Sequence, residues 1–196
     1  MTREPIYHDG MRALQDHFGT RALADRLAQH TRRETFTSDD QAFVQSRTFF
    51  FLATADDGGF PDCSYKGGAP GWVFLTGPTS LAFPSLDGNG MFRSLGNLSV
   101  NPKVGMLFLS FDPPRRLRVN GNARIDFDDP ALDRFPGADA MVHVEAKGIF
   151  PNCPRYIHQG DGLSPYLDQG HGAEVPGWKR RAEFADALPK KKDVPV

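Results

Sequence analysis

The sequence contains little cysteine. Its 196 residues include only Cys63 and Cys153, and the two form no CxxC pair. This excludes the disulfide framework of a small secreted domain. Two lone thiols fit a reducing cytoplasm, with a single bridge between them left open. We therefore expect a cytoplasmic protein.

Charge of one sign and long apolar runs are also lacking. The formal net charge is −1, so no global field favours nucleic acid or an acidic membrane surface, and any anion-binding site must be a local cluster. No uninterrupted apolar run reaches membrane-spanning length. The first ten residues, MTREPIYHDG, carry acid and no apolar segment, so they do not resemble a secretory signal. We expect no nucleic-acid partner and no membrane insertion.

The short motifs of the commonest nucleotide-binding and hydrolytic sites are missing. There is no GxxxxGKS/T P-loop, no GxGxxG fingerprint between a strand and a helix, and no GxSxG nucleophile elbow. The histidines show no HxxxH or HExxH spacing, so we expect no metal site. The six histidines are His8, His17, His30, His143, His158 and His171.

The apolar residues that are present are rich in phenylalanine. Sixteen Phe against two Trp and four Tyr predict a core made largely of phenyl rings. The run Thr48–Ala55, bounded by Asp56-Asp57-Gly58-Gly59, is typical of a buried strand that enters a hairpin turn. Strands are expected at residues 48–55, 60–65, 72–75, 80–83, 104–111, 116–125 and 140–146. This pattern favours a mostly β fold with flanking helices, built around a closed or nearly closed antiparallel barrel.

Two helices are predicted before these strands and one between them. One covers residues 11–30, weakened in the middle by Gly19. A second begins at Ser38 in the capping box Ser38-Asp39-Asp40-Gln41. A third covers about residues 90–100 and ends at Asn101-Pro102.

Composition divides the chain into three segments. An N-terminal helical arm covers residues 1–36 and the barrel domain covers residues 37–160. Residues 161–196, rich in Gly, Asp, Pro and Lys, read as a solvated, partly flexible C-terminal arm. Trp178 is the exception there, because a tryptophan is rarely left with nothing to pack on.

Two basic residues, Arg93 and Lys66, lie at positions that a bound anion would explain. Arg93 lies in the first turns of the third predicted helix, where a cation opposes the helix dipole unless an anion is bound. The glycines of the preceding Asp87-Gly88-Asn89-Gly90 let backbone N–H groups approach such a ligand. Lys66 ends a strand, and Gly67-Gly68 after it leave room for a bulky group beside its side chain. The alternative for each cation is an ordinary solvated side chain.

A third basic cluster lies on the strand at residues 116–125. Alternation places Arg116, Arg118 and Asn120 on one face and Leu117 and Val119 on the other. Two like charges on one face are either solvated or share an anion. A phosphorylated small ligand would explain all three clusters at once.

The run from Phe49 to Ile125 resembles the pyridoxamine 5′-phosphate oxidase-like family of FMN-binding split barrels. The order FFLATADDGGFPDCSYK, SLAFPS, DGNGMFRSLGNLSVNPKVGMLFLSF and RRLRVNGNARI matches it throughout. The most specific part is Arg93 near a helix start, then Asn101-Pro102-Lys103-Val104 and an apolar strand. The resemblance implies an antiparallel split barrel that forms a homodimer, with FMN in each of two clefts between the subunits.

The resemblance also implies which residues contact the FMN. The strand end around Lys66 would follow the flavin ring toward the phosphate, and the helix start around Arg93 would hold the phosphate. Arg116, with Arg118, would reach the flavin edge or the phosphate. The full predicted set is Ser64, Tyr65, Lys66, Phe83, Pro84, Asn89, Arg93, Ser94, Arg116 and Arg118.

The sequence departs from the family pattern at two places. Ser94 stands where family members commonly carry a second basic residue. Trp178-Lys179-Arg180-Arg181 is followed by no histidine, unlike the substrate motif of the vitamin B6 oxidases. The vitamin B6 activity is therefore not carried over.

The expectation is an FMN-dependent oxidoreductase that acts on a small organic substrate. Lys66 and Arg116 would supply positive charge that stabilises the anionic reduced flavin. The alternatives are a flavin-binding or redox-sensing module without turnover, or the same barrel holding haem or a deazaflavin. Haem would require an axial histidine ligand, and the histidine nearest to the motif region is His143.

Overall fold

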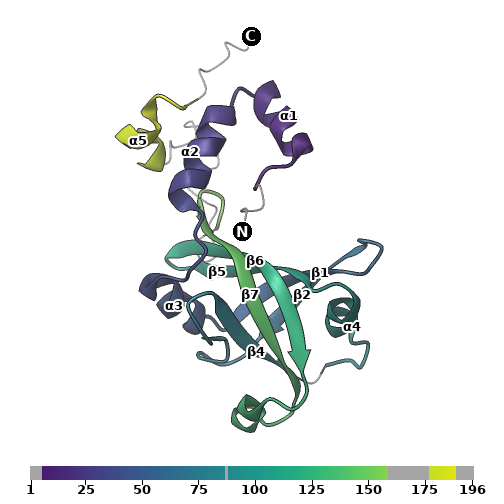
Figure 1. The fold of residues 1–196 in the computed structure, drawn as a ribbon. Helices are drawn as coiled ribbons and strands as arrows, with labels where there is room; N and C mark the ends of the chain where they lie inside the picture. The colour runs from purple at the N-terminus through teal and green to yellow at the C-terminus, as the bar shows by residue number, and fades with distance from the viewer. Residues whose placement is uncertain (1–5, 87, 159–176, 189–196) are drawn as a thin grey trace. The chain divides into compact units, whose positions relative to one another are not determined.

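The computed structural model describes residues 6–86, 88–158 and 177–188. The chain divides into two compact units (Figure 1). One unit combines Met1–Arg32 with Leu163–Val196, and the other is Arg33–Gly162. Both terminal segments therefore fall in one unit, and the strands fall in the other.

The unit Arg33–Gly162 is built on one antiparallel sheet with a few flanking helices. Its seven strands are β1 (Phe49–Ala55), β2 (Pro61–Gly67), β3 (Phe74–Leu75), β4 (Ser80–Leu86), β5 (Lys103–Phe111), β6 (Pro114–Asp126) and β7 (Ala138–Asn152). They pair in the order β2-β1-β5-β6-β7-β4-β3. The mostly β antiparallel fold is thus confirmed. The sheet is not closed, because no ladder among the described residues joins β2 to β3.

The core of this unit is aromatic, as the composition predicted. Alternation along β1 buries Phe50, Leu52 and Thr54. The ring of Phe50 lies 5.0 Å from that of Phe83 and 5.4 Å from that of Trp72. A Cβ on Gly68 would stand 2.5 Å from the Trp72 ring. The bulky group that this glycine accommodates is therefore the protein's own indole, which corrects the expectation of open room there.

Helix α3 (Ser38–Gln45) begins with a capping box that is shifted by one residue from the predicted one. The N-cap is Thr37, whose hydroxyl accepts from the Asp40 N–H at 3.1 Å, while the Asp40 carboxylate accepts from the Thr37 N–H at 3.0 Å. Asp40 closes the box in place of the predicted Gln41 because it also bonds Arg33.

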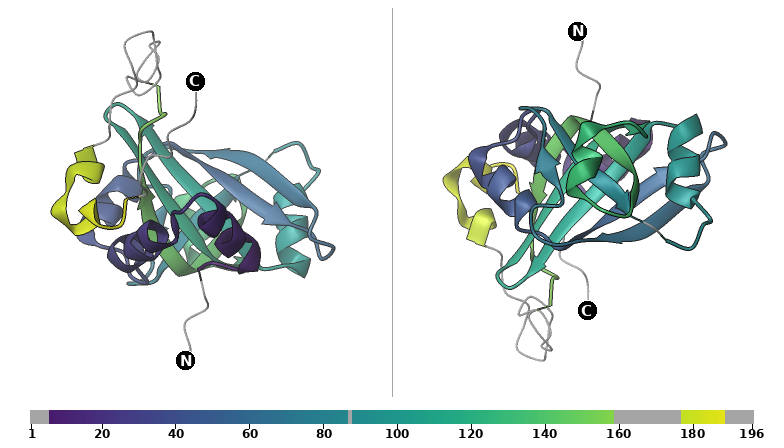
Figure 2. Two further views of the ribbon diagram at one scale, coloured as in Figure 1. Left: turned by 90° about the horizontal axis from the view of Figure 1, so that it is seen from above. Right: turned by 90° about the horizontal axis from the view of Figure 1, so that it is seen from below.

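Helix α4 (Arg93–Val100) connects β4 to β5 and packs beside the β1–β2 hairpin, as both views in Figure 2 show. A 3-10 helix, η1 (Pro130–Arg134), connects β6 to β7. The strand predicted at residues 140–146 is much longer, because β7 continues beside β6 to Asn152.

The other unit contains two N-terminal helices in place of the single helix predicted at residues 11–30. These are α1 (Asp9–His17) and α2 (Arg21–Thr31), separated at Gly19, whose φ of +61° ends the first helix.

The described part of the predicted C-terminal arm is helical. It forms η2 (Gly177–Arg180) and α5 (Ala182–Ala185). The Trp178 ring packs 5.6 Å from that of Phe184, in a small core that includes Leu23. The rest of the arm, residues 161–176 and 189–196, lies outside the described residues. None of the described helices combines the length and apolar character that a membrane crossing requires.

Candidate functional site

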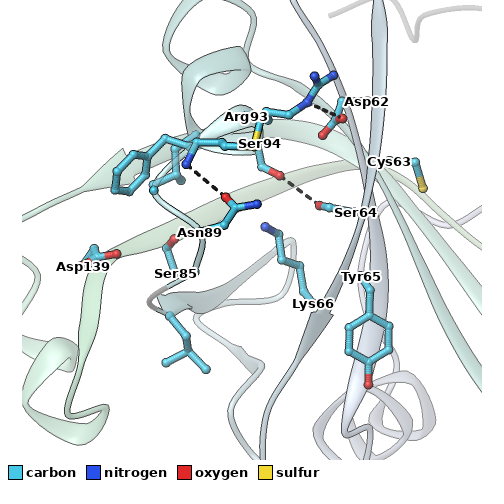
Figure 3. A pocket seen from close by; sticks show the side chains of 16 residues that line it. Asp62, Cys63, Ser64, Tyr65, Lys66, Ser85, Asn89, Arg93, Ser94 and Asp139 are labelled. Carbon is cyan, nitrogen blue, oxygen red and sulfur yellow. Dashed lines mark hydrogen bonds and ion pairs between the residues drawn. The ribbon is translucent and has the colours of Figure 1, made fainter.

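A pocket of about 350 Å³ lies between β2, the end of β4 and the start of α4 (Figure 3). Its described lining is Asp62, Cys63, Ser64, Tyr65, Lys66, Ser85, Leu86, Gly88, Asn89, Gly90, Met91, Phe92, Arg93, Ser94, Leu95 and Asp139. The pocket joins two of the three cation clusters that the sequence indicated. Its volume falls at the lower end of the range of small-molecule sites.

Strand β2 presents one polar face to this region. Asp62, Ser64 and Lys66 alternate along it and pair with the inward-facing Thr54, Leu52 and Phe50 of β1. Cys63 and Tyr65 point to the opposite face of the sheet, and both are exposed. The pleat of one strand therefore sets a carboxylate, a hydroxyl and an ammonium in a row.

The start of α4 supplies backbone donors. Its N-cap residue, Phe92, makes no side-chain cap and has a φ of +47°, a left-handed conformation that is rare for a bulky residue. The first N–H groups of the helix have no partner within it. Such strain is often retained at binding sites. Arg93, Ser94 and Leu95 all line the pocket, so the first turn of the helix borders it.

Two further hydrogen bonds organise the polar groups. The hydroxyls of Ser64 and Ser94 lie 3.0 Å apart and link β2 to α4. The side-chain oxygen of Asn89 accepts from the Met91 N–H at 3.1 Å, which leaves the amide NH₂ of Asn89 as a donor.

Lys66 is a half-buried cation in this pocket. Burial of the ammonium lowers the pKa of Lys66 below its ordinary value, and the carboxylate of Asp62 acts in the opposite direction. No hydrogen bond or ion pair joins its ammonium to another residue of the ranges 6–86, 88–158 and 177–188. In Figure 3 the ammonium points toward Asn89. A desolvated cation of this kind favours an anion beside it.

Arg93 already has an acidic partner. Its Nε donates to the carboxylate of Asp62 at 3.0 Å. The side chain of Arg93 is 56% exposed, whereas that of Asp62 is only 16% exposed. The pocket thus contains two cations, Lys66 and Arg93, and two described carboxylates, Asp62 and Asp139.

The structure brings most, but not all, of the predicted residues together. Ser64, Tyr65, Lys66, Asn89, Arg93 and Ser94 line the pocket. Phe83 and Pro84 are buried in β4, just before Ser85, which does line it. Phe83 packs in the aromatic core rather than against the pocket.

Arg116 and Arg118 do not line the pocket of their own chain. Both stand on the face of β6 opposite to the buried Leu117 and Val119, as the alternation predicted. The guanidinium of Arg116 donates to the carbonyl of Cys153, and that of Arg118 lies 5.7 Å from the centre of the Phe150 ring.

The same face of the sheet carries a cluster of stacked rings, which we call the outer aromatic face: Phe49, Phe51, Tyr65 and Phe111. The Phe49 ring stacks at 5.3 Å on Tyr65 and at 6.3 Å on Phe111. Tyr65 is 62% exposed and Phe111 is 48% exposed. An apolar cluster left this open is typical of a surface that another molecule covers.

Sequence reasoning missed the two described carboxylates of the pocket, Asp62 and Asp139. The signal for Asp62 was present, because a strand that points Lys66 inward also points Ser64 and Asp62 the same way. Asp139 had no such signal, since it reaches the pocket only through the pairing of β7 with β4.

A second polar cluster lies elsewhere in the sheet and is already bonded internally. One oxygen of Asp129 accepts from the Ala131 N–H at 2.7 Å, and the other bonds to the ring of His143. Asp126 accepts from Arg124 at 2.7 Å. His143, the histidine nearest to the motif region in sequence, is therefore engaged with Asp129. Neither Cys63 nor Cys153 takes part in a disulfide.

Comparison with solved structures found several similar chains. HupZ of Group A Streptococcus is 15% identical, covering 66% of this chain and 98% of its own, with a TM-score of 0.49. An FMN-binding protein from Syntrophomonas wolfei is 12% identical over 74% and 96% of the chains, with a TM-score of 0.44. HutZ, the haem storage protein of Vibrio cholerae, is 20% identical over 55% and 88%, with a TM-score of 0.40.

Comparison with curated proteins found no match. Comparison with protein families found one described as pyridoxamine 5′-phosphate oxidase, which matches residues 36–163. This stretch contains all seven strands and every residue that lines the pocket. Because the match spans more than half of the 196 residues, the chain belongs to the pyridoxamine 5′-phosphate oxidase family.

Proposed function

We propose that this protein binds FMN, with the phosphate of the cofactor at the start of α4. The observation that carries the proposal is Lys66. Its ammonium is half-buried, its pKa is lowered by that burial, and no described acid forms a hydrogen bond or ion pair with it. A dianionic phosphate would compensate the cost of desolvating this charge.

The donor groups around Lys66 fit a phosphate. Ser64 and Ser94 offer hydroxyls, Asn89 offers its amide, and the start of α4 offers backbone N–H groups without a side-chain cap. Arg93 supplies the second positive charge at the same helix turn. The departure at Ser94 loses one charge relative to the common family pattern, but a hydroxyl stays in its place, 3.0 Å from the hydroxyl of Ser64, and either of the two can be the donor.

We also propose that a second copy of the chain covers the outer aromatic face. Tyr65 belongs both to this face and to the lining of the pocket. A partner placed over Tyr65 would lie against β2, the edge strand that borders the pocket. Arg116 and Arg118 stand on the same face of the sheet, so in a homodimer they would reach the partner's flavin rather than their own.

The proposed activity is oxidation or reduction of a small organic substrate. Bound FMN would supply hydride transfer at its N5 atom. The residues of this chain would bind, orient and supply charge: Lys66 and the partner's Arg116 favour the anionic reduced flavin. None of the described pocket residues is placed as a convincing acid or base. The cytoplasmic location stays a prediction.

The test is the absorption spectrum of the purified protein after addition of FMN and desalting. We expect the wild type to retain a flavin spectrum and Arg93→Ala to lose it. Arg124→Ala, which removes an exposed arginine paired with Asp126, is the matched control and should retain the flavin. Loss of flavin from the wild type as well, or a haem spectrum in the purified protein, would overturn the cofactor assignment. If the wild type retains FMN, steady consumption of NADH or NADPH would distinguish an enzyme from a flavin-binding module without turnover.

A further inference from the structure

We propose that Asp62 sets the affinity of the pocket for a phosphorylated ligand by competing with the phosphate for Arg93. This inference rests on the proposed function, because it concerns how the same pocket receives its anion. Nothing in the family resemblance pointed to Asp62. It follows from the one ion pair among the described charged groups of the pocket.

The geometry separates the two cations. In Figure 3 the Nε of Arg93 faces Asp62, while the ammonium of Lys66 points toward Asn89. A phosphate held by Lys66 and the first turn of α4 can recruit Arg93 only if the guanidinium turns away from Asp62. The contact to be broken is a single hydrogen bond from Nε, and the exposed side chain of Arg93 is free to move.

The movement leaves Asp62 in an unfavourable position. Its carboxylate is mostly buried, so it cannot exchange Arg93 fully for water. It would also face a group that carries about −1.5 to −2 charges at neutral pH. Both effects oppose the phosphate, and neither acts on a ligand that lacks one. Asp62 therefore lowers the affinity for phosphorylated ligands, and it keeps Arg93 paired when no ligand is bound.

The opposite role for Asp62 would be to orient Arg93 for the phosphate. In that arrangement the terminal nitrogens of Arg93 would face the donors of Ser64, Ser94 and Lys66 while Nε stays on Asp62. Figure 3 instead shows the guanidinium turned away from Lys66. The two roles predict opposite effects of neutralising Asp62, which makes them separable.

The experiment compares FMN with riboflavin, which has the same ring but no phosphate, by fluorescence titration of the full chain. We expect Asp62→Asn to tighten FMN binding by about three- to tenfold and to leave riboflavin binding unchanged. Asp62→Ala should likewise bind FMN more tightly and riboflavin with unchanged affinity, which excludes an effect of the new amide group alone. Asp139→Asn removes a carboxylate from the same pocket, away from Arg93, and should give a clearly smaller gain.

The outcomes distinguish this inference from the proposed function. Weaker FMN binding by Asp62→Asn would show that Asp62 orients Arg93. An equal change in the affinities for FMN and riboflavin would show that Asp62 acts on the flavin ring. Either result overturns the inference but leaves the proposal of FMN binding intact. Unchanged FMN affinity in both Asp62 variants would overturn it as well. If the wild type binds neither FMN nor riboflavin, the proposed function fails, and the inference fails with it.

Discussion

The Nη2 of Arg33 lies 2.7 Å from both carboxylate oxygens of Asp40, and this contact ties the entry of the strand-rich unit to helix α3. The Asp40 side chain is 2% exposed, and it also accepts from the Thr37 N–H to complete the capping box. The backbone of Arg33 pairs with Ile149 of β7 in both directions. One carboxylate thus connects a helix cap to the long strand of the sheet.

We expect Asp40→Ala to lower the free energy of unfolding by about 3 kcal/mol, because it removes a cap and leaves Arg33 without its partner. Asp39→Ala is the matched control at the neighbouring position. Asp39 also pairs with an arginine, Arg115, but its side chain is 76% exposed, so its loss should cost about 0.5 kcal/mol or less. Urea unfolding of the two variants measures the difference. Equal losses would contradict a special role for Asp40.

Gly121 marks a bulge where β6 passes β7, and it has no room for a side chain. A Cβ there would stand 2.2 Å from the Glu145 carbonyl oxygen, a backbone atom that cannot move away cheaply. We expect Gly121→Ala to destabilise the protein by about 3 kcal/mol. Gly96→Ala, in α4 with nothing within 4 Å of its Cβ, should be neutral or stabilising by up to about 1 kcal/mol. Thermal unfolding followed by circular dichroism tests the pair; a neutral Gly121→Ala would show that β7 can shift.

The outer aromatic face makes a prediction about assembly. Phe111→Glu places a charge among stacked rings, and we expect it to shift the protein from dimer to monomer because a buried unpaired charge is costly. Phe60→Glu changes an equally apolar ring that is 72% exposed and stacks on none of the rings of this face. It should leave the dimer intact. Sedimentation velocity gives the masses. A monomeric wild type would remove the proposed interface altogether.

Much of the fold was predictable because it depends on local pattern. The dense apolar run Phe49–Ala55, followed by the turn residues Asp56-Asp57-Gly58-Gly59, predicts a buried strand by itself, whereas its inward face was seen only in the alternating burial of the folded strand. The ends of elements were less predictable. Thr37, not Ser38, caps α3 because Arg33 holds Asp40 in place, and that contact is made by tertiary structure.

The candidate site was predictable where the chain brings its residues together locally. Asn89, Arg93 and Ser94 belong to one loop and one helix start, and the sequence placed them together. The pairing of Arg93 with Asp62 joins residues 31 positions apart, through the packing of α4 on the β1–β2 hairpin. The same holds for Arg116, whose bond to the Cys153 carbonyl depends on the register of β6 against β7.

We expect the charged side chain of Lys66 to lower the free energy of unfolding and to be necessary for FMN binding. Because burial lowers the pKa of Lys66 in the folded state, the unfolded chain binds its proton more tightly. The penalty is complete at any pH below both pKa values, and the wild type regains stability as the pH rises through the folded pKa. We therefore expect Lys66→Met to raise the melting temperature at neutral pH, with a gain that shrinks in alkaline buffer, and to weaken FMN binding.

The pH dependence of FMN binding gives the second half of this test. The charged form of Lys66 attracts the phosphate, so the affinity of the wild type should fall as the pH rises, and it should do so below the pH at which an ordinary lysine titrates. Lys66→Arg keeps its charge throughout this range and should lose that dependence. Titrations with FMN across neutral and alkaline pH, on both proteins, measure it. If the FMN affinities of the wild type and Lys66→Arg change with pH in the same way, Lys66 does not contact the phosphate. If Lys66→Met is stable and binds FMN as the wild type does, the half-buried ammonium binds some other anion.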